Sequence, residues 1–451
     1  MAGAPRAPKV LRLRLSASVL GLLIIGPLVV AIVDLGAERW YPALELAETE
    51  LHVRDVGTSH TPLTGLIGRL GTFEDRGSHP GPLSFVALSP VYRLAGSSPW
   101  ALQVATVVLH LAAIGLALWI AHRRGGPWLV LLFATAATLL LRFYGAALLT
   151  EPWNPYLPML WWVTFIMAVW SVVEDDLALL PVVVVAGSLC AQTHVSYVGL
   201  VAALGGWAVI TVAVRGRRRR ASDLAEERSF PWLALSTAIG GALWLPPVID
   251  ELTRERGNLS VLVDSFTSSS EDTIGFGQGL RLVMLNLDPA RLLLGHADAK
   301  VVIDPPSWPA GGLGLLTVWS GSIMAAWRLE HRALMRLNVA LGIALTSGVL
   351  VTSRVYGATW AWLVQWVWGV TALMVVAIAW AVSAIVRNSS TPRRSVRIAA
   401  VGALAAMALG SAGALTSDAT HVEPDDVASS RALQDLAPAT IEFIDRSGSG
   451  S

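Results

Sequence analysis

The sequence predicts an all-α polytopic membrane protein with a bundle of about eleven transmembrane helices, and three observations support this fold class. Of the 451 residues, 54% are hydrophobic and only 14% are charged, whereas a soluble domain carries about 25% charged residues. The mean hydropathy is +0.58. Many separate apolar runs reach the roughly 20 residues that a helix needs to cross a bilayer. Because lipid offers the backbone no hydrogen-bond partners, these runs are expected to be helices.

The expected spans follow the apolar runs in chain order. They lie near residues 16–34, 99–121, 127–144, 155–173, 177–192, 195–214, 230–248, 311–328, 337–353, 361–386 and 398–416. The first run is expected to be retained as a helix, because no small-x-small cleavage site of a signal peptide follows it. Arginines cluster in alternate loops, and basic loops stay on the cytoplasmic side. The N-terminus is therefore expected in the cytoplasm, and the acidic loop 174–176 is the exception to the pattern.

One short apolar segment decides how the chain is threaded. Residues 81–96, GPLSFVALSPVYRLAG, make only about half of a membrane-crossing length. Counting them as a span would invert every later basic loop, so we expect a re-entrant or interfacial helix on the outer side. A transmembrane domain is then expected over 1–416, with outer loops at 35–98 and 249–310. The tail 417–451 is expected outside, as a linker or as the start of an extracytoplasmic domain.

Composition and motifs exclude several classes of function. The net charge of +1 gives no indication of a nucleic-acid partner. The single cysteine, Cys190, excludes an internal disulfide and a thiol-ligated metal. The chain has no P-loop and no dinucleotide fingerprint, so ATP-driven chemistry is not expected. Because the cytoplasmic loops contain little besides arginine, any chemistry is expected on the outer face.

The first outer loop concentrates polar residues between long apolar runs. Asp55, which follows Arg54, is a candidate general base toward a sugar hydroxyl; the alternative is a surface carboxylate paired with an arginine. His60 lies in the same loop as a candidate substrate contact. Glu74 and Asp75 form a rival acidic pair, although their neighbours are typical of a solvated turn.

Four later positions and the end of this loop complete the candidate list. His79 precedes the short helix, where free N–H groups favour a phosphate and where a plain helix-start signal is the alternative. Arg142 and Glu151 flank the next outer region, with snorkelling as the alternative. His194 lies in a tight outer hairpin. Arg354 precedes a row of tryptophans, which suits an interfacial belt or a phosphate site beside a sugar or isoprenoid.

Three motifs occur together in the first part of the chain. A long outer loop holds an Asp, a short helix begins at HPGPL and runs to YRLAGSSPWALQ, and the following span ends at HRRGG. Over residues 15–200 this pattern resembles the GT-C membrane glycosyltransferases, in particular protein-mannosyltransferases, aminoarabinose transferases and actinobacterial arabinofuranosyl- and mannosyltransferases.

The resemblance implies an inverting transfer of a sugar on the outer face of a bacterial plasma membrane. The donor would be a polyprenyl-phosphate sugar and the acceptor an envelope glycan, lipid or protein. By position, the resemblance implies Asp55 as the base, His79 as a phosphate contact and Glu151 as a second acidic site near the acceptor. It fixes no cofactor and leaves a divalent cation as an open option.

Two other classes of function stay open. A transporter or flippase needs polar groups at mid-span depth, but the predicted spans hold almost no ionisable residue apart from His110. A non-catalytic scaffold with the same fold is the second alternative. The loop 249–310 is expected to cover the site, with the glycines at 275, 277 and 279 as hinges of a lid or as parts of a passive loop.

Overall fold

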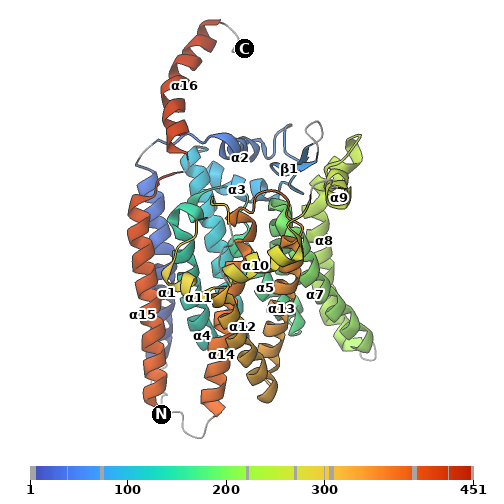
Figure 1. The fold of residues 1–451 in the computed structure, drawn as a ribbon, viewed down its shortest axis with the longest axis vertical. Coiled ribbons are helices and arrows are strands. Elements are labelled where there is room, and N and C mark those ends of the chain that lie inside the picture. Colours follow the sequence, from blue (N-terminus) through green and yellow to red (C-terminus); the bar gives the residue numbers. More distant parts are fainter. Residues whose placement is uncertain are drawn as a thin grey trace, which may run out of the picture.

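The computed structural model describes residues 7–37, 39–71, 76–219, 223–268, 272–298, 300–303, 309–388, 394–424 and 426–447. Within these ranges the chain is helical apart from one antiparallel hairpin and the connecting loops. Long helices run side by side, and the hairpin and the short helices Leu44–Asp55 and Leu83–Leu94 gather at one end of the bundle, which we call the upper face, whereas the short helices Gly275–Asn286 and Pro289–Leu294 lie part-way down its side (Figure 1). The lower face is the opposite end. The predicted all-α polytopic class is confirmed.

The helices and strands follow one another in chain order. They are α1 (Ala7–Leu35), α2 (Leu44–Asp55), β1 (Ile67–Gly71), β2 (Arg76–Ser78), α3 (Leu83–Leu94), α4 (Pro99–Thr150), α5 (Met159–Val173), α6 (Leu180–Thr193), α7 (Val198–Arg219), α8 (Asp223–Thr253), α9 (Asn258–Ser268), α10 (Gly275–Asn286), α11 (Pro289–Leu294), α12 (Ala310–Arg328), α13 (Arg332–Thr352), α14 (Trp366–Asn388), α15 (Arg394–Asp418) and α16 (Val427–Ser447). Short 3₁₀ turns occupy Leu177–Leu179, Val195–Tyr197, Ala361–Val364 and Ala419–His421.

Each predicted span coincides with a long helix or part of one. Among the described residues, seven helices are long and apolar enough to cross a membrane, and four shorter apolar helices accompany them. Helix α4 accounts for two predicted spans, because its 52 residues are divided by non-helical backbone at Gly126, where φ is 64°. The total of eleven spans and the cytoplasmic side of the N-terminus stay predictions.

Helix α5 forms the centre of the bundle. All 15 of its residues are buried, and it packs against α4, α6, α7, α13 and α14. A helix that is apolar on every side is stable only inside other protein or lipid, which explains the run of tryptophan, valine and phenylalanine in its sequence. Helix α3 is only 12 residues long, about 18 Å, and lies at the upper end of the bundle (Figure 1).

The lower face explains the acidic loop 174–176. Each of its carboxylates is paired with an arginine from a neighbouring basic segment. The pairs are Arg124–Glu174 at 3.2 Å, Arg336–Glu174 at 2.7 Å, Arg215–Asp175 at 3.0 Å and Arg123–Asp176, with Arg123 Nη2 at 2.9 Å from Oδ1. The acidic loop therefore complements the charge of the basic loops around it and does not contradict their common side.

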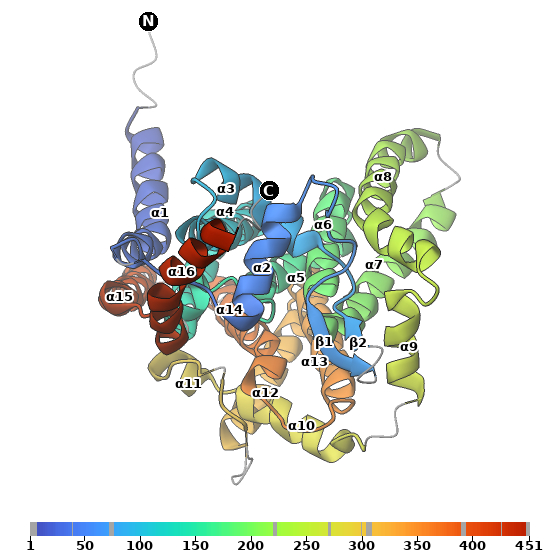
Figure 2. The same ribbon diagram turned by 90° about the horizontal axis from the view of Figure 1, so that it is seen from above.

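The upper loops place α2 over the bundle and three short helices around its edge. Seen from above, α2 and the β1–β2 hairpin lie across the helix ends, while α9, α10 and α11 follow the rim (Figure 2). The hairpin was not predicted and is the one departure from an all-α chain in the described ranges. The described parts of residues 249–310 therefore follow the outside of the bundle, with α9 at the upper face and α10 and α11 part-way down (Figure 1), and their predicted role as a lid stays a prediction.

Candidate active site

Two carboxylates from separate upper segments are linked through a tryptophan and a lysine that contact each other. Glu45 lies in the first turn of α2, and Glu151 is the C-cap residue of α4. Trp153 Nε1 donates a hydrogen bond to Glu45 Oε2, and Lys300 Nζ lies 3.2 Å from Glu151 Oε1. The same Nζ lies 5.3 Å from the centre of the Trp153 ring. These four side chains, here called the upper cluster, come from α2, from the segment after α4 and from the segment between α11 and α12.

The backbone around the upper cluster is fixed by local sequence. Helix α4 ends at Glu151 because the residue before a proline is pushed out of the helical region, and Pro152 follows it. Glu151 has an extended ψ of 122°. Lys300 precedes a short extended segment that pairs with the loop before α14, where Ala361 N donates to Val301 O at 2.9 Å. The carboxylate and the ammonium group are thus held by separate backbone constraints.

Aromatic side chains line one side of the upper cluster. Trp153 makes edge contacts with Tyr156 and with Trp362, each at a ring distance of 5.0 Å. Trp360 stacks on Trp362 at 4.6 Å. The three tryptophans are half-buried and Tyr156 is buried. Half-buried aromatic rings offer apolar faces with polar edges, which suits a sugar ring or an isoprenoid chain.

The predicted tryptophan row therefore divides into two parts. Trp360 and Trp362 join the aromatic side of the upper cluster. Trp366 and Trp368 are only 1% and 2% exposed and belong to the core of α14. Arg354, which precedes the row, is exposed, and its guanidinium makes no hydrogen bond or ion pair with another described residue.

The beginning of the C-terminal tail lies beside the upper cluster. The pKa of Asp426 is lowered, first by the hydrogen bond from the Ser429 side chain and also by the charge of Lys300. Ser430 Oγ accepts a hydrogen bond from Tyr41 N at 2.9 Å, in the segment that leads to α2. Helix α16 then rises away from the upper face (Figure 1). The tail thus contacts the membrane domain before it leaves it.

Asp55 lies at the other end of α2. It is ten residues beyond Glu45 and closes the helix, about 15 Å away along the helix axis. Its carbonyl oxygen accepts a hydrogen bond from Thr58 N at 3.0 Å. Within the described ranges, no hydrogen bond or ion pair reaches its carboxylate. The described contacts link Glu45 to Glu151 through Trp153 and Lys300, and they do not link Asp55, predicted as the catalytic partner of Glu151, to this cluster.

Arg54 contributes to packing between two upper helices. Its Nη2 lies 3.1 Å from Glu50 Oε1, and the same oxygen accepts a hydrogen bond from the Tyr92 hydroxyl at 2.8 Å. Burial raises the pKa of Tyr92, so the hydroxyl stays protonated and remains a donor to Glu50. Arg93 donates to the backbone oxygens of Arg54 and Val56 at the end of α2. These contacts fix α2 on α3.

His79 and His194 form a stacked pair below the hairpin. Their ring centres are 4.7 Å apart with an interplanar angle of 29°. His79 Nδ1 accepts a hydrogen bond from Val195 N at 3.2 Å, and His194 Nδ1 lies 2.7 Å from Ser196 Oγ and 3.4 Å from Ser196 N. A backbone N–H can only donate, so the network assigns the proton of each neutral ring to Nε2.

Burial keeps both rings of this pair neutral. It lowers the pKa of His79 to about 4. Burial lowers the pKa of His194 well below its ordinary value, and the neighbouring His79 adds to the effect. No described residue accepts a hydrogen bond from either Nε2, so the pair offers two neutral N–H donors. The structure thus brings together two residues that the sequence placed in separate loops.

The hairpin holds His79 in place through its backbone. His79 N donates to Leu66 O at 2.8 Å, and Gly65 N donates to His79 O at 3.0 Å. A side chain on Gly65 would lie 2.8 Å from His79 Cβ, so a glycine is required for this close approach. Asn258, at the start of α9, accepts from Ser78 N at 2.7 Å and donates to Ser78 O at 3.1 Å. Asn258, in the stretch GNLS (residues 257–260), therefore anchors the loop that carries His79.

The remaining predicted residues lie apart from the upper cluster or outside the described residues. His60 is exposed in the loop after α2, where Ser59 Oγ lies 3.4 Å from its Nδ1. Arg142 Nη1 donates to two carbonyl oxygens at the end of α11, at 2.8 and 3.1 Å, so its guanidinium caps that helix. Glu74 and Asp75 lie outside the described residues.

The described residues contain no group of three or more His, Cys, Asp and Glu side chains arranged to hold a metal ion. In the upper cluster, the positive charge beside Glu151 comes from Lys300. The cluster can therefore accept a proton at a carboxylate and contact an anion at an ammonium group. Transfer of a group away from a phosphate needs both: a general base for the attacking hydroxyl and a positive charge beside the departing phosphate.

Comparisons with known proteins agree with the fold described above. No protein-family model and no curated protein sequence matches the chain. Among solved structures, the crystal structure of ArnT from Cupriavidus metallidurans in the apo state is similar, with a TM-score of 0.50 and 14% sequence identity over 90% of this chain and 77% of that chain. ArnT is a GT-C glycosyltransferase. At this identity the similarity shows the fold, and the chain has a GT-C-like membrane fold.

Proposed function

We propose that this protein is a membrane glycosyltransferase that moves a sugar from a polyprenyl-phosphate donor to a cell-envelope acceptor. The upper face would be the extracytoplasmic side of a bacterial plasma membrane. One observation carries the proposal: the first two outer segments each supply a carboxylate to the upper cluster, where Lys300 and Trp153 lie between them. The likeness of the fold to ArnT supports the same class of reaction.

The proposed reaction is a single displacement with inversion. A hydroxyl oxygen of the acceptor attacks the anomeric carbon of the donor, and the bond from that carbon to the phosphate oxygen breaks. The hydroxyl proton passes to a carboxylate, and polyprenyl phosphate leaves with the bonding electron pair. A positioned base contributes about 10²–10⁴-fold in rate. An ammonium group beside the departing phosphate stabilises the charge that develops there.

The geometry favours the carboxylates of the upper cluster over Asp55 for the base. Glu45 and Glu151 are linked through Trp153 and Lys300, so a donor phosphate at Lys300 would lie near a carboxylate that can serve as the base. Lys300 would exchange its contact with Glu151 for the donor phosphate. Trp360 and Trp362 would contact the sugar or the isoprenoid.

Turnover of purified protein with a panel of radiolabelled polyprenyl-phosphate sugars tests the proposal. We expect transfer with one sugar class and about 10²-fold slower transfer in Glu45→Gln or Glu151→Gln. Glu48→Gln is a matched control, because Glu48 lies on the same helix and pairs with His52 instead of the upper cluster. Asp55→Asn is the competing variant.

Two outcomes would change this proposal. A loss in Asp55→Asn with full activity in Glu45→Gln and Glu151→Gln would move the base to the end of α2. If folded wild-type protein transfers none of the sugars, the proposed enzymatic function is wrong. That result would favour a non-catalytic protein with a GT-C-like fold.

A further inference from the structure

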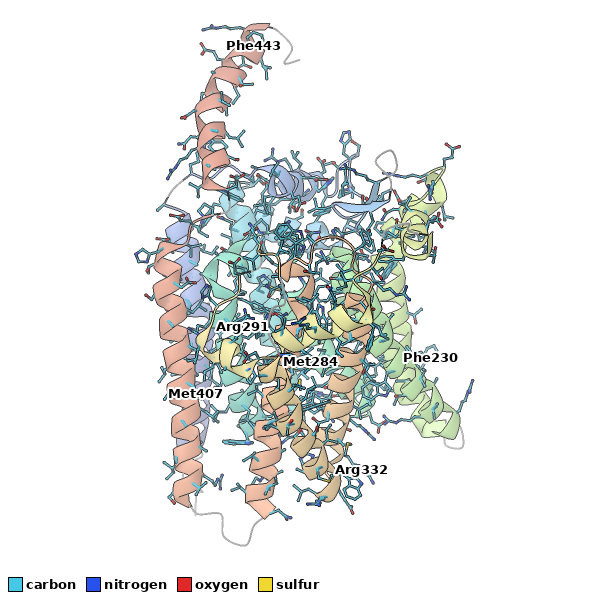
Figure 3. All side chains as sticks on the ribbon, viewed as in Figure 1. Phe230, Met284, Arg291, Arg332, Met407 and Phe443 are labelled. Carbon is cyan, nitrogen blue, oxygen red and sulfur yellow. The ribbon has the colours of Figure 1, made fainter. Side chains whose placement is uncertain are left out.

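A cavity of about 640 Å³ opens at the lower face, where the chain turns from α12 into α13. It lies at the opposite end of the molecule from the upper cluster, and Figure 3 labels Arg332 at the lower tip of α13. The large side chains that line the cavity include those of Trp327, Arg328, Glu330, Arg332, Met335 and Arg336. Neither the fold nor the proposed transfer reaction assigns it a role.

The lining of this cavity is basic. Three arginines face one carboxylate, that of Glu330, so the charged lining residues sum to +2 (three positive, one negative). Arg328 and Arg332 are exposed, and their guanidinium groups make no hydrogen bond or ion pair with other residues that the structure describes. Arg336 is paired with Glu174 outside the lining, whereas the like charges of Arg328 and Arg332 repel each other, and this repulsion is relieved when an anion binds.

Arg336 is already oriented for such an anion. Its Nη1 lies 2.7 Å from Glu174 Oε1 and 2.8 Å from Val173 O. Its Nε and Nη2 have no hydrogen-bond partner among the described residues. One nitrogen of the planar guanidinium therefore fixes the group, and two N–H-bearing nitrogens remain for a ligand. A pre-oriented guanidinium loses less side-chain entropy on binding than a mobile one.

The apolar part of the lining places the cavity at a membrane surface. Trp327 is 67% exposed in the last turn of α12, at the end of a helix that is a candidate membrane span. Tryptophan is enriched where hydrocarbon meets the lipid headgroups, and Met335 adds a second apolar wall. A ligand of this cavity therefore has a charged head beside an apolar body.

We propose that this cavity binds the phosphate headgroup of an anionic phospholipid. Arginine forks match phosphate oxygens with paired charge-assisted hydrogen bonds. Basic pockets between transmembrane helices at the cytoplasmic surface bind such headgroups. The volume suits a ligand of many atoms, such as a headgroup with its glycerol. The Trp327 and Met335 side chains would contact the glycerol and the first acyl carbons.

Native mass spectrometry of the purified protein tests this lipid site. The protein would be titrated with phosphatidylglycerol and, separately, with zwitterionic phosphatidylcholine. The double variant Arg328→Gln/Arg332→Gln removes two exposed charges. The matched control Arg217→Gln/Arg397→Gln removes two exposed charges from α7 and α15. We expect the wild type and the control to retain phosphatidylglycerol in preference to phosphatidylcholine, and the cavity variant to bind it about tenfold more weakly.

Inorganic phosphate distinguishes a lipid headgroup from a free anion. If millimolar phosphate occupies the site and phosphatidylglycerol shows no preference over phosphatidylcholine, the lipid proposal is wrong. Equal binding of phosphatidylglycerol by the wild type, the cavity variant and the control would also overturn it. The result is independent of sugar transfer, because the upper cluster is unchanged in all these variants.

Discussion

Lys300→Gln is the most informative single change at the upper cluster. It removes the charge that lies 3.2 Å from Glu151 and 5.3 Å from the Trp153 ring centre, while it keeps a polar side chain. At an effective dielectric of about 20, the attraction across 3.2 Å is about 5 kcal/mol before dehydration is subtracted. The Lys300 side chain is 41% exposed, so solvent screening reduces the net stability to about 1 kcal/mol.

The contact with the Trp153 ring adds about 0.5–1 kcal/mol at an exposed site. The free energy of unfolding should therefore fall by about 1–2 kcal/mol in Lys300→Gln, and the melting temperature by a few degrees. The variant is expected to fold, which allows its kinetics to be interpreted.

The kinetic effect should be larger than the effect on stability. If Lys300 contacts the departing phosphate, the variant loses a charge-assisted hydrogen bond of about 1.5–3 kcal/mol. This corresponds to a decrease in kcat/KM of about 10- to 150-fold. Lys300→Arg keeps the charge and should retain most of the activity. Wild-type kcat/KM in Lys300→Gln, measured with the donor at limiting concentration, would refute the role of Lys300 toward the phosphate.

Three further predictions concern the scaffold and can be measured by thermal melting of purified protein. Burial lowers the pKa of His79 to about 4, so His79 alone should cost the wild type up to about 3 kcal/mol as pH falls from 6.5 to 4, because only the unfolded state binds its proton in this window. The stacked His194, whose pKa burial also lowers, adds to this loss. His79→Leu should depend less on pH across the same window, and equal slopes would contradict this account. In Gly81→Ala the new Cβ would lie 2.7 Å from Gln192 Cδ and 2.8 Å from its Cγ. We expect the free energy of unfolding to fall by about 1–3 kcal/mol and to recover in part when Gln192→Ala is added. An unchanged melting temperature in Gly81→Ala would refute the clash. Glu174→Gln breaks two ion pairs at a carboxylate that is only 13% exposed, and it should lower the free energy of unfolding by about 2–4 kcal/mol. Asp175→Asn, at a side chain that is 42% exposed, should lower it by less than about 1 kcal/mol. Equal losses in the two variants would show that burial is not the deciding factor.

The membrane spans could be predicted because each is encoded in a continuous stretch of sequence. A helix in lipid satisfies its own backbone, so an apolar run of sufficient length is enough to identify it. The predicted break at HRRGG is visible as the non-helical backbone of Gly126 within α4. The β1–β2 hairpin escaped prediction because its strands are only 5 and 3 residues long, too short for an alternating pattern to be recognised.

The upper cluster could be predicted only in part, because its members come from distant segments. Glu151 was identified because two prolines shape the chain after it. Glu45 stands in the stretch ELAETE, which has the composition of any solvated helix, and only its contact with Trp153 distinguishes it. A signal for Lys300 was present, since it is one of two lysines in an arginine-rich sequence. Its partner Glu151 lies 149 positions away, and no local pattern joins them.

The end of α15 connects the scaffold to the upper cluster. The last part of α4 departs from helical backbone at Gly145, where φ is 77°. There Asp418 Oδ2 accepts a hydrogen bond from Ala146 N at 2.8 Å. This contact supports the final turn of α4, which ends at Glu151. A few residues later Val422 N donates to Asp34 Oδ2 at 3.2 Å, at the end of α1.

The segment 418–430 therefore touches three places that lead to the upper cluster: the end of α1, the loop before α2 and the last turn of α4. A predicted domain boundary at residue 417 would divide this set of contacts. Apolarity ends near 416, and for that reason the sequence suggested a boundary there. The packing that positions Glu45 and Glu151 continues for about one further dozen residues, so a truncation meant to isolate the membrane domain should retain the chain through Ser430.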